Sequence, residues 1–108
     1  MSEDDAEAYV EQVLRVVERI PSGRATTYST IAEYVGRGGP RQVGRVMALH
    51  GGAVPWWRVV RADGSLPRAH QAEALAQYRR EETPLRGSVA DAASLRVDLG
   101  AARWAPEP

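Results

Sequence analysis

The sequence predicts a mainly α-helical fold: a single winged helix-turn-helix-like domain over residues 1–108, with a small hairpin wing. Three observations predict it. Apolar residues recur at helical spacing in four segments. Two of those segments are short and flank a glycine-rich turn, which is typical of a helix-turn-helix and places one at about residues 28–50. An Asp-Gly pair that follows two valines indicates a hairpin.

The first helix is expected over about residues 3–19. Ser2 and Asp5 resemble a capping box at its start, and Pro21 follows its end. The residues with helical spacing, which should face the core, are Val10, Val13, Leu14, Val17 and Ile20.

Two short helices should follow. The second helix begins near Tyr28 with Thr27 as its cap, and Gly36 ends it. Pro40 suits the first position of the third helix, which is the recognition helix by order and ends before Gly51. The inner face of this third helix is expected to be Val43, Val46, Met47 and Leu49.

The rest of the chain is less regular. Val59-Val60 should form a short buried strand, which Asp63-Gly64 folds back into a hairpin with the segment at Leu66. A fourth helix is expected from His70 to Glu82, because Thr83-Pro84 stops it. Its inward residues are Leu75 and Tyr78, the strand-like tail is Leu95, Val97 and Leu99, and the last aromatic, which could fold back as a lid, is Trp104.

The charge of the chain is unevenly distributed although the net charge is zero. The segment from Arg24 to Arg68 contains seven arginines and two carboxylates, a local net charge of +5, and the flanks carry an equal excess of negative charge. All fourteen basic residues are arginine, a choice that coding bias could explain, whereas the segregation needs another cause. A basic centre between acidic ends favours a polyanionic partner such as DNA.

The composition excludes several classes of function. The chain has no cysteine, so it has no disulfide, thiolate metal site or cysteine nucleophile. His50 and His70 lack metal-ligand spacing, and we expect no metal and no cofactor. No apolar run approaches the roughly 18 residues of a membrane span, and the acidic start differs from a signal peptide. We expect a soluble, monomeric, cytoplasmic protein that is nucleoid-associated when bound to DNA.

The segment Pro55-Trp56-Trp57-Arg58-Val59-Val60 holds two adjacent indoles in a turn that proline makes rigid. Taken alone, a Trp-Trp pair is explained by core packing, because tryptophan is highly buried on average. A binding role therefore needs support from the rest of the sequence.

That support comes from three blocks: residues 20–32, Arg41-Gln42-Val43-Gly44, and residues 55–66. Together they resemble the DNA-binding domain of the O6-alkylguanine-DNA alkyltransferases. Those enzymes carry Pro-Cys-His-Arg-Val where this chain has Pro-Trp-Trp-Arg-Val, so Trp56 stands at the acceptor cysteine. A tryptophan there is typical of the alkyltransferase-like proteins. The resemblance implies binding of O6-alkylguanine in double-stranded DNA by base flipping from the minor groove, without alkyl transfer, and hand-over to nucleotide excision repair proteins.

The resemblance also assigns roles within the helix-turn-helix. Arg41 matches the finger that fills the gap left by the extruded base; without the resemblance it would be a solvated arginine. Gly44, one turn later, leaves room either for DNA or for a closely packed neighbour. Tyr28 matches the tyrosine that crowds the phosphate beside the target nucleotide, and a core tyrosine is the alternative.

The pocket is outlined in the same way. Trp56 offers a flat face on which a base can stack. Trp57 departs from the family, which keeps a histidine there, and could fill the pocket and narrow what it accepts. Arg58 either holds the turn or contacts DNA, and Val59 lies where the family's pocket offers backbone groups to the guanine edge. Arg68 stands near an arginine directed at the damaged base, whose O6 a guanidinium can hydrogen-bond.

Two other functions stay open at this point. An ordinary helix-turn-helix regulator would read undamaged sequence in the major groove and would be indifferent to alkylation. An alkyltransferase with another nucleophile would have to use serine, threonine or tyrosine, and the chain shows no evident Ser/His/Asp set.

Overall fold

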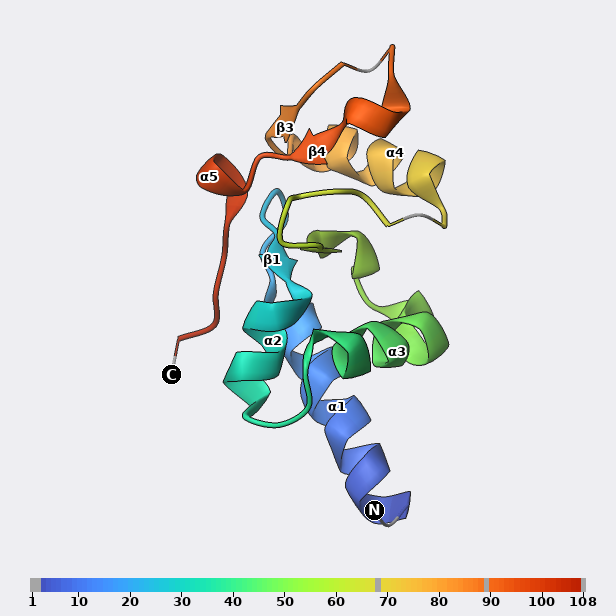
Figure 1. The fold of residues 1–108 in the computed structure, drawn as a ribbon, viewed down its shortest axis with the longest axis vertical. Coiled ribbons are helices and arrows are strands. Elements are labelled where there is room, and N and C mark those ends of the chain that lie inside the picture. The colour runs from blue at the N-terminus through green and yellow to red at the C-terminus, as the bar shows by residue number, and fades with distance from the viewer. Residues whose placement is uncertain (1–2, 68, 89, 108) are drawn as a thin grey trace.

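Helices dominate the computed structural model, which describes residues 3–67, 69–88 and 90–107 (Figure 1). The lower half of Figure 1 contains α1 (Glu3–Arg19), α2 (Tyr28–Val35) and α3 (Pro40–His50). The upper half contains α4 (Gln71–Glu81), β3 (Leu85–Arg86), β4 (Arg96–Val97) and α5 (Leu99–Ala102). Short 3₁₀ turns lie at Gly51–Ala53, Trp56–Arg58 and Ala92–Ser94. Among the described residues, no helix is both long and apolar enough to cross a membrane.

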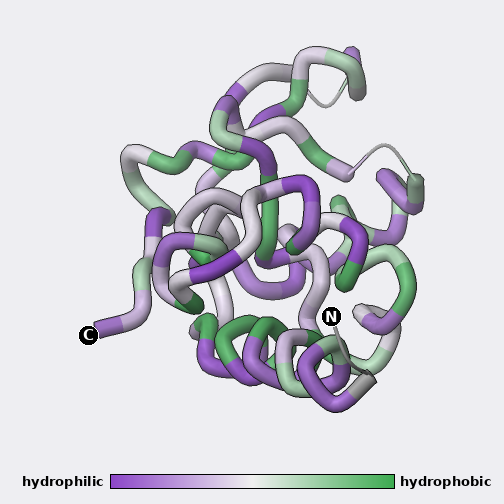
Figure 2. The backbone as a smooth tube through the Cα atoms, turned by 60° about the horizontal axis from the view of Figure 1, so that its bottom comes forward, coloured by the Kyte–Doolittle hydropathy of each residue, from purple (hydrophilic) through white to green (hydrophobic). Residues whose placement is uncertain are grey.

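The lower half surrounds the first of two apolar clusters. Because the apolar residues of α1 recur at helical spacing, they gather on one side of the helix, and in Figure 2 this side is turned to the rest of the chain. The same cluster takes residues from α2, α3 and β2 (Val59–Val60); its buried members are Val13, Val16, Val17, Ile20, Ile31, Ala32, Val43, Val46, Val54 and Val59.

The ends of α2 and α3 follow from local chemistry and confirm the predicted helix-turn-helix. Thr27 caps α2 by accepting a hydrogen bond from the Thr30 amide at 3.1 Å. Gly36 ends the helix in the left-handed region, with φ of 83°. Pro40 opens α3, whose start is closed by the side chain of Gln42, which accepts from the Gly39 amide at 2.8 Å.

Two short strands join the two halves. Strands β1 (Thr26–Thr27) and β2 (Val59–Val60) pair in parallel, with Thr26 opposite Val59 and Thr27 opposite Val60. Because successive side chains of a strand point to opposite faces, Val59 enters the first cluster and Val60 enters the second. The second cluster fills the upper half; its buried members are Ala25, Val60, Leu66, Ala74, Tyr78, Leu95, Val97, Leu99 and Ala102.

The predicted hairpin wing is wrong in its pairing. The chain does turn at Asp63-Gly64, where the Gly64 amide donates to the Arg61 carbonyl at 2.8 Å. Strand β2 nevertheless pairs with β1, and Ser65 forms an antiparallel bridge with Arg96. Gly64 has a φ of 80°, and a Cβ there would lie 2.3 Å from the Val97 carbonyl oxygen, so this turn packs closely against β4.

Other expectations need smaller corrections. Leu49 was expected in the core but is 66% exposed, because it lies on the outer side of the last turn of α3. Helix α4 is one residue shorter at each end than predicted, and Tyr78 is buried in it whereas Leu75 is only partly buried. Trp104 does fold back, but it packs against the first cluster, and its amide donates to the Ala25 carbonyl at 2.8 Å. Ser2, half of the predicted capping box, lies outside the described residues.

Replacing Thr27 should show how much the cap of α2 contributes. Thr27→Ala loses the hydroxyl and the buried methyl, whereas Thr27→Ser loses only the methyl, so the difference between the two variants isolates the hydroxyl, which bonds both the amide and the hydroxyl of Thr30. We expect Thr27→Ala to be less stable than Thr27→Ser by about 1 kcal/mol in urea unfolding. Equal stability of the two variants would show that the hydroxyl contributes nothing.

Candidate nucleic-acid interface

A cavity of about 530 Å³ opens between α2, α3 and the segment that precedes α4. It brings together three residues that the sequence predicted for the site: Tyr28, Gly44 and Trp56. The walls are mostly small or apolar; the other described lining residues are Met47, Ala48, Gly51, Gly52, Pro67, Ala69 and His70. Such a cavity suits a flat ligand with few polar groups, since aromatic and apolar walls hold planar rings by stacking.

Trp56 forms one wall because of the turn that carries it. Pro55 precedes the 3₁₀ turn Trp56–Arg58, in which the Arg58 amide donates to the Pro55 carbonyl at 3.1 Å. The indole of Trp56 stays partly exposed and has two aromatic neighbours. The ring of Trp57 stands edge-on to it, with centroids 5.7 Å apart, and the ring of His70 lies 6.0 Å away.

Tyr28 and Gly44 lie next to each other in the lining of the cavity. A Cβ on Gly44 would lie 4.0 Å from the Tyr28 ring, an ordinary contact, so the absent side chain mainly keeps this stretch of α3 open. Burial raises the pKa of the Tyr28 phenol, and the Arg61 cation offsets part of that rise. The hydroxyl therefore stays neutral at physiological pH and can donate a hydrogen bond.

A second depression, of about 480 Å³, continues the cavity past the start of α3. It shares Tyr28, Gly44 and Pro67 with the cavity and adds two exposed arginines, Arg41 and Arg61. Neither arginine forms an ion pair within the described part of the chain. Two unpaired guanidinium groups beside an aromatic cavity are suited to phosphate groups that flank a bound base.

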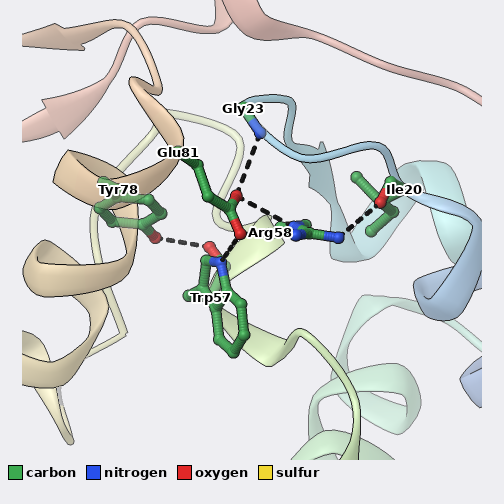
Figure 3. A network of polar contacts seen from close by, with 6 residues as sticks. All are labelled: Ile20, Gly23, Trp57, Arg58, Tyr78 and Glu81. Atoms are coloured by element: carbon green, nitrogen blue, oxygen red, sulfur yellow. Dashed lines mark hydrogen bonds and ion pairs between the residues drawn. The ribbon is translucent and has the colours of Figure 1, made fainter.

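Behind the cavity, a network of polar contacts centres on Glu81 of α4 (Figure 3). Arg58 donates from Nε to Glu81 Oε1 at 3.1 Å and from Nη2 to Oε2 at 2.5 Å. The Gly23 amide donates to Oε1 at 3.0 Å, and Trp57 Nε1 donates to Oε2 at 3.1 Å. Arg58 also donates to the Ile20 carbonyl at 2.8 Å. The contacts of Arg58 are therefore those of a residue that holds the turn, one of the two roles left open above.

Two further sequence predictions concern Trp57, which belongs to this network, and Val59, which follows it in the chain after Arg58. Trp57 was expected to fill the pocket, yet its indole points to Glu81 and it is not among the described residues that line the cavity. The indole takes this direction because its N–H donates a hydrogen bond to the Glu81 carboxylate. Val59 is fully buried in β2 and is likewise not among those lining residues. Arg68 lies outside the described residues, so its predicted approach to the base stays a prediction.

The structure also adds residues that sequence reasoning missed. Glu81 gave no signal because it lies in an acidic pair, Glu81-Glu82, that is typical of a solvated helix end. The ring of His70 lies beside that of Trp56 because the His70 backbone is left-handed, with φ of 63°, and no local sequence motif predicts this conformation. The sequence alone could have identified Arg61, because it directly follows the block Arg58-Val59-Val60, whose two valines form β2. The described residues contain no group of three or more His, Cys, Asp or Glu side chains that could hold a metal ion.

Comparison with protein families gives one match that covers most of the chain. The model of the 6-O-methylguanine DNA methyltransferase DNA-binding domain matches residues 8–83. This range contains most of α1, all of α2 to α4, and both the cavity and the Glu81 network.

Individual proteins that are similar to this chain indicate the same family. A DNA base-flipping protein of Escherichia coli is 30% identical over 101 residues, which cover 91% of this chain and 75% of that protein. A DNA base-flipping protein of Vibrio parahaemolyticus is 33% identical over 61 residues, and the match spans only 61% of its length. The structure of S. pombe Atl1 in complex with damaged DNA containing O6-carboxymethylguanine superposes with a TM-score of 0.78, at 27% identity over 98% of this chain and 100% of that one.

The Glu81 network should make stability depend on pH in a specific direction. Burial raises the pKa of the Glu81 carboxyl, but hydrogen bonds from Arg58, Gly23 and Trp57 outweigh it and hold the pKa below its ordinary value. A carboxyl whose pKa is lowered in the folded state stabilises it above the unfolded-state pKa, and this contribution is lost as pH falls through the folded-state pKa.

We expect Glu81→Gln to be about 2 kcal/mol less stable than the wild type at pH 7, because the charged hydrogen bonds are weakened. The difference should stay constant between about pH 6 and 8 and shrink as the pH falls below about 4, because the carboxyl of the unfolded chain is protonated first and that of the folded chain keeps its charge until its lowered pKa is reached. Urea unfolding at a series of pH values measures it. A gap that widens on acidification would contradict the stated direction.

Proposed function

The chain belongs to the family of the 6-O-methylguanine DNA methyltransferase DNA-binding domain, and from this membership we propose that it binds O6-alkylguanine in DNA by base flipping, without alkyl transfer. The recognition helix α3 would enter the minor groove. Arg41 would fill the place of the extruded base, and the base itself would occupy the cavity beside Trp56.

The observation that carries this proposal is the position of Trp56. It lines a cavity of about 530 Å³ together with Tyr28, and the adjoining depression, which shares Tyr28, contains Arg41. A base extruded from the duplex needs a partner for its exposed face, and stacking on an aromatic side chain is worth about 1 to 3 kcal/mol. An O6-alkyl group weakens pairing of the guanine, so the cost of extrusion is lowest at the lesion.

The names of the relatives support both parts of the proposal. The Escherichia coli and Vibrio parahaemolyticus relatives are DNA base-flipping proteins. The S. pombe complex supports an O6-alkylated guanine as the ligand. An indole cannot accept an alkyl group as a thiolate does, and the chain has no cysteine, which supports binding without repair.

The remaining residues of the predicted site take part in the proposal in different ways. Arg41 and Arg61 would contact phosphates or fill the duplex, and Gly44 would allow the close approach of α3. Arg68 would contact the O6 substituent and Val59 the guanine edge; both assignments rest on the family resemblance. Trp57 and Arg58 would act on the lesion indirectly.

The proposal extends to the protein's partners and setting. We infer that residues 1–108 act as a single domain and as a monomer, and that the bound, distorted duplex is handed to nucleotide excision repair proteins. This step rests on the family resemblance, as does a cytoplasmic location with association to the nucleoid. The excess of arginine between Arg24 and Arg68 supports DNA as the direct partner.

The function is tested by equilibrium binding to one duplex sequence with either guanine or O6-methylguanine at a single site. We expect tighter binding to the alkylated duplex. A 2-aminopurine at the target position should brighten on binding as it leaves the stack. Equal affinity for both duplexes, no brightening and preference among undamaged sequences would instead identify a sequence-reading helix-turn-helix regulator.

Two variants divide the binding energy. Trp56→Ala should lower affinity for the alkylated duplex by roughly five- to 150-fold, the value of one stacked base, while affinity for undamaged duplex changes little. Arg41→Ala should weaken binding to both duplexes, because compensation for the extruded base is lost in each. If Trp56→Ala kept the lesion preference of the wild type, the cavity would not be the lesion site.

The absence of alkyl transfer is tested by mass spectrometry. After prolonged incubation with O6-methylguanine duplex, we expect the masses of both protein and DNA to be unchanged, because no thiolate is available. A protein that gains one methyl group while guanine is restored would be an alkyltransferase that uses another nucleophile.

A further inference from the structure

We propose that Glu81 is a positioning residue for the lesion cavity, and that it acts through Trp57 to hold the indole of Trp56 in the cavity wall. The inference rests on the proposed function and deepens it, because it assigns a role in lesion discrimination to two residues that do not line the cavity. It also accounts for the tandem tryptophans, of which only the first lines the cavity.

The first step is that Glu81 itself is immobile. Its side chain is 7% exposed, and its two oxygens accept hydrogen bonds from Gly23, Trp57 and Arg58. Figure 3 shows these donors converging on the carboxylate from three sides. With both oxygens occupied, the carboxylate cannot rotate without breaking at least one charged hydrogen bond.

The second step is that Glu81 and its helix fix Trp57 at three points. The carboxylate accepts from the indole Nε1 at 3.1 Å. The guanidinium of Arg58, itself paired with Glu81, lies 5.5 Å from the centroid of the same indole. The Tyr78 hydroxyl, one turn earlier in α4, donates to the Trp57 carbonyl at 2.6 Å, so the backbone is held by the same helix as the side chain.

The third step carries this restraint to Trp56. The two indoles meet at 85° with centroids 5.7 Å apart, an edge-to-face contact whose energy depends on the angle. No hydrogen bond to the described residues fixes the indole N–H of Trp56, so its orientation depends on its packing against the second cluster and on its ring neighbours, Trp57 and His70. His70 is exposed, which leaves Trp57 as the rigid one of the two.

A wall that is ordered before the base arrives should favour the lesion. Binding then spends no free energy on ordering Trp56, so more of the stacking energy remains to offset base extrusion. Contacts with phosphates do not use this wall. Loss of the Glu81 restraint should therefore reduce the preference for alkylated guanine more than it reduces the affinity for undamaged duplex.

The experiment is a double-mutant cycle on the lesion preference, defined as the ratio of the dissociation constants for guanine and O6-methylguanine duplexes. Trp57→Phe keeps an aromatic edge beside Trp56 but removes the N–H that Glu81 accepts. Glu81→Gln keeps the volume of the side chain but removes its charge. The control is Val16→Ala, which opens a gap in the first cluster, away from the network.

We expect each single variant of the network to lower the lesion preference by about three- to tenfold, which is less than the value of one charge-assisted hydrogen bond because the restraint acts on Trp56 only through Trp57. The double variant should be little worse than either single variant, because Trp57→Phe removes and Glu81→Gln weakens the same hydrogen bond. Val16→Ala should lower the stability but leave the preference at the wild-type value. The 2-aminopurine signal of the network variants should still rise, because flipping by Arg41 is intact.

Three results would overturn the inference. Unchanged preference in Trp57→Phe and Glu81→Gln, with reduced stability, would make the network purely structural. Fully additive losses would show that the two residues act separately. In both cases a wild-type preference for the lesion would leave the proposed function standing, whereas a wild type without any preference would remove the function and the inference together.

Discussion

The ion pair between Arg58 and Glu81 is the constraint on which the other parts of the structure depend. The two halves have separate apolar clusters, which are joined by the pairing of β1 with β2, by the bridge between Ala25 and Arg103 and by Trp104, which packs against the first cluster. Arg58 extends from the segment between the halves to the end of α1, through the Ile20 carbonyl, and to α4, through Glu81. Both side chains are largely withdrawn from water, at 16% and 7% exposure. Truncation of either side chain would leave the other charge buried without any partner, which costs about 3 to 5 kcal/mol and thus more than the exchange of Glu81 for glutamine, so the pair contributes strongly to how the halves meet.

Sequence reasoning succeeded for the fold where the signal was local. Thr27, Gly36 and Pro40 each act on the helix that they adjoin, so α2 and α3 begin and end where the sequence predicted. The hairpin failed for the opposite reason. Asp63-Gly64 specifies a turn but not the partner of the strand before it, and β2 found that partner in β1, far earlier in the chain. The exposure of Leu49 likewise depends on where α3 ends relative to α1, which its own spacing does not determine.

The candidate site divides in the same way. Tyr28, Gly44 and Trp56 come together, with Arg41 beside them, because the matching blocks fix their positions in the helix-turn-helix and the following turn. The direction of Trp57 was not predictable, because successive side chains of a 3₁₀ turn point to different sides and the choice of partner depends on α4. Glu81 becomes recognisable only when α4 is packed, since the same sequence on a free helix would place both Glu81 and Glu82 in water. In the folded chain, Glu82 is the exposed member of this pair.

A cavity with a tryptophan wall differs from one with a thiolate in how long the bound state lasts. A transferable alkyl group would be lost in the reaction, whereas stacking leaves the lesion intact and the complex at equilibrium. Its lifetime then depends on two differences between alkylated and normal guanine: the lower cost of extrusion at the lesion and the contacts of the base with the cavity. The first difference belongs to the DNA and is available to any flipping protein. In the proposed mechanism the second would belong to Trp56 and to the residues that hold it, so the rigidity of this wall would be the part of lesion selectivity that the protein itself determines.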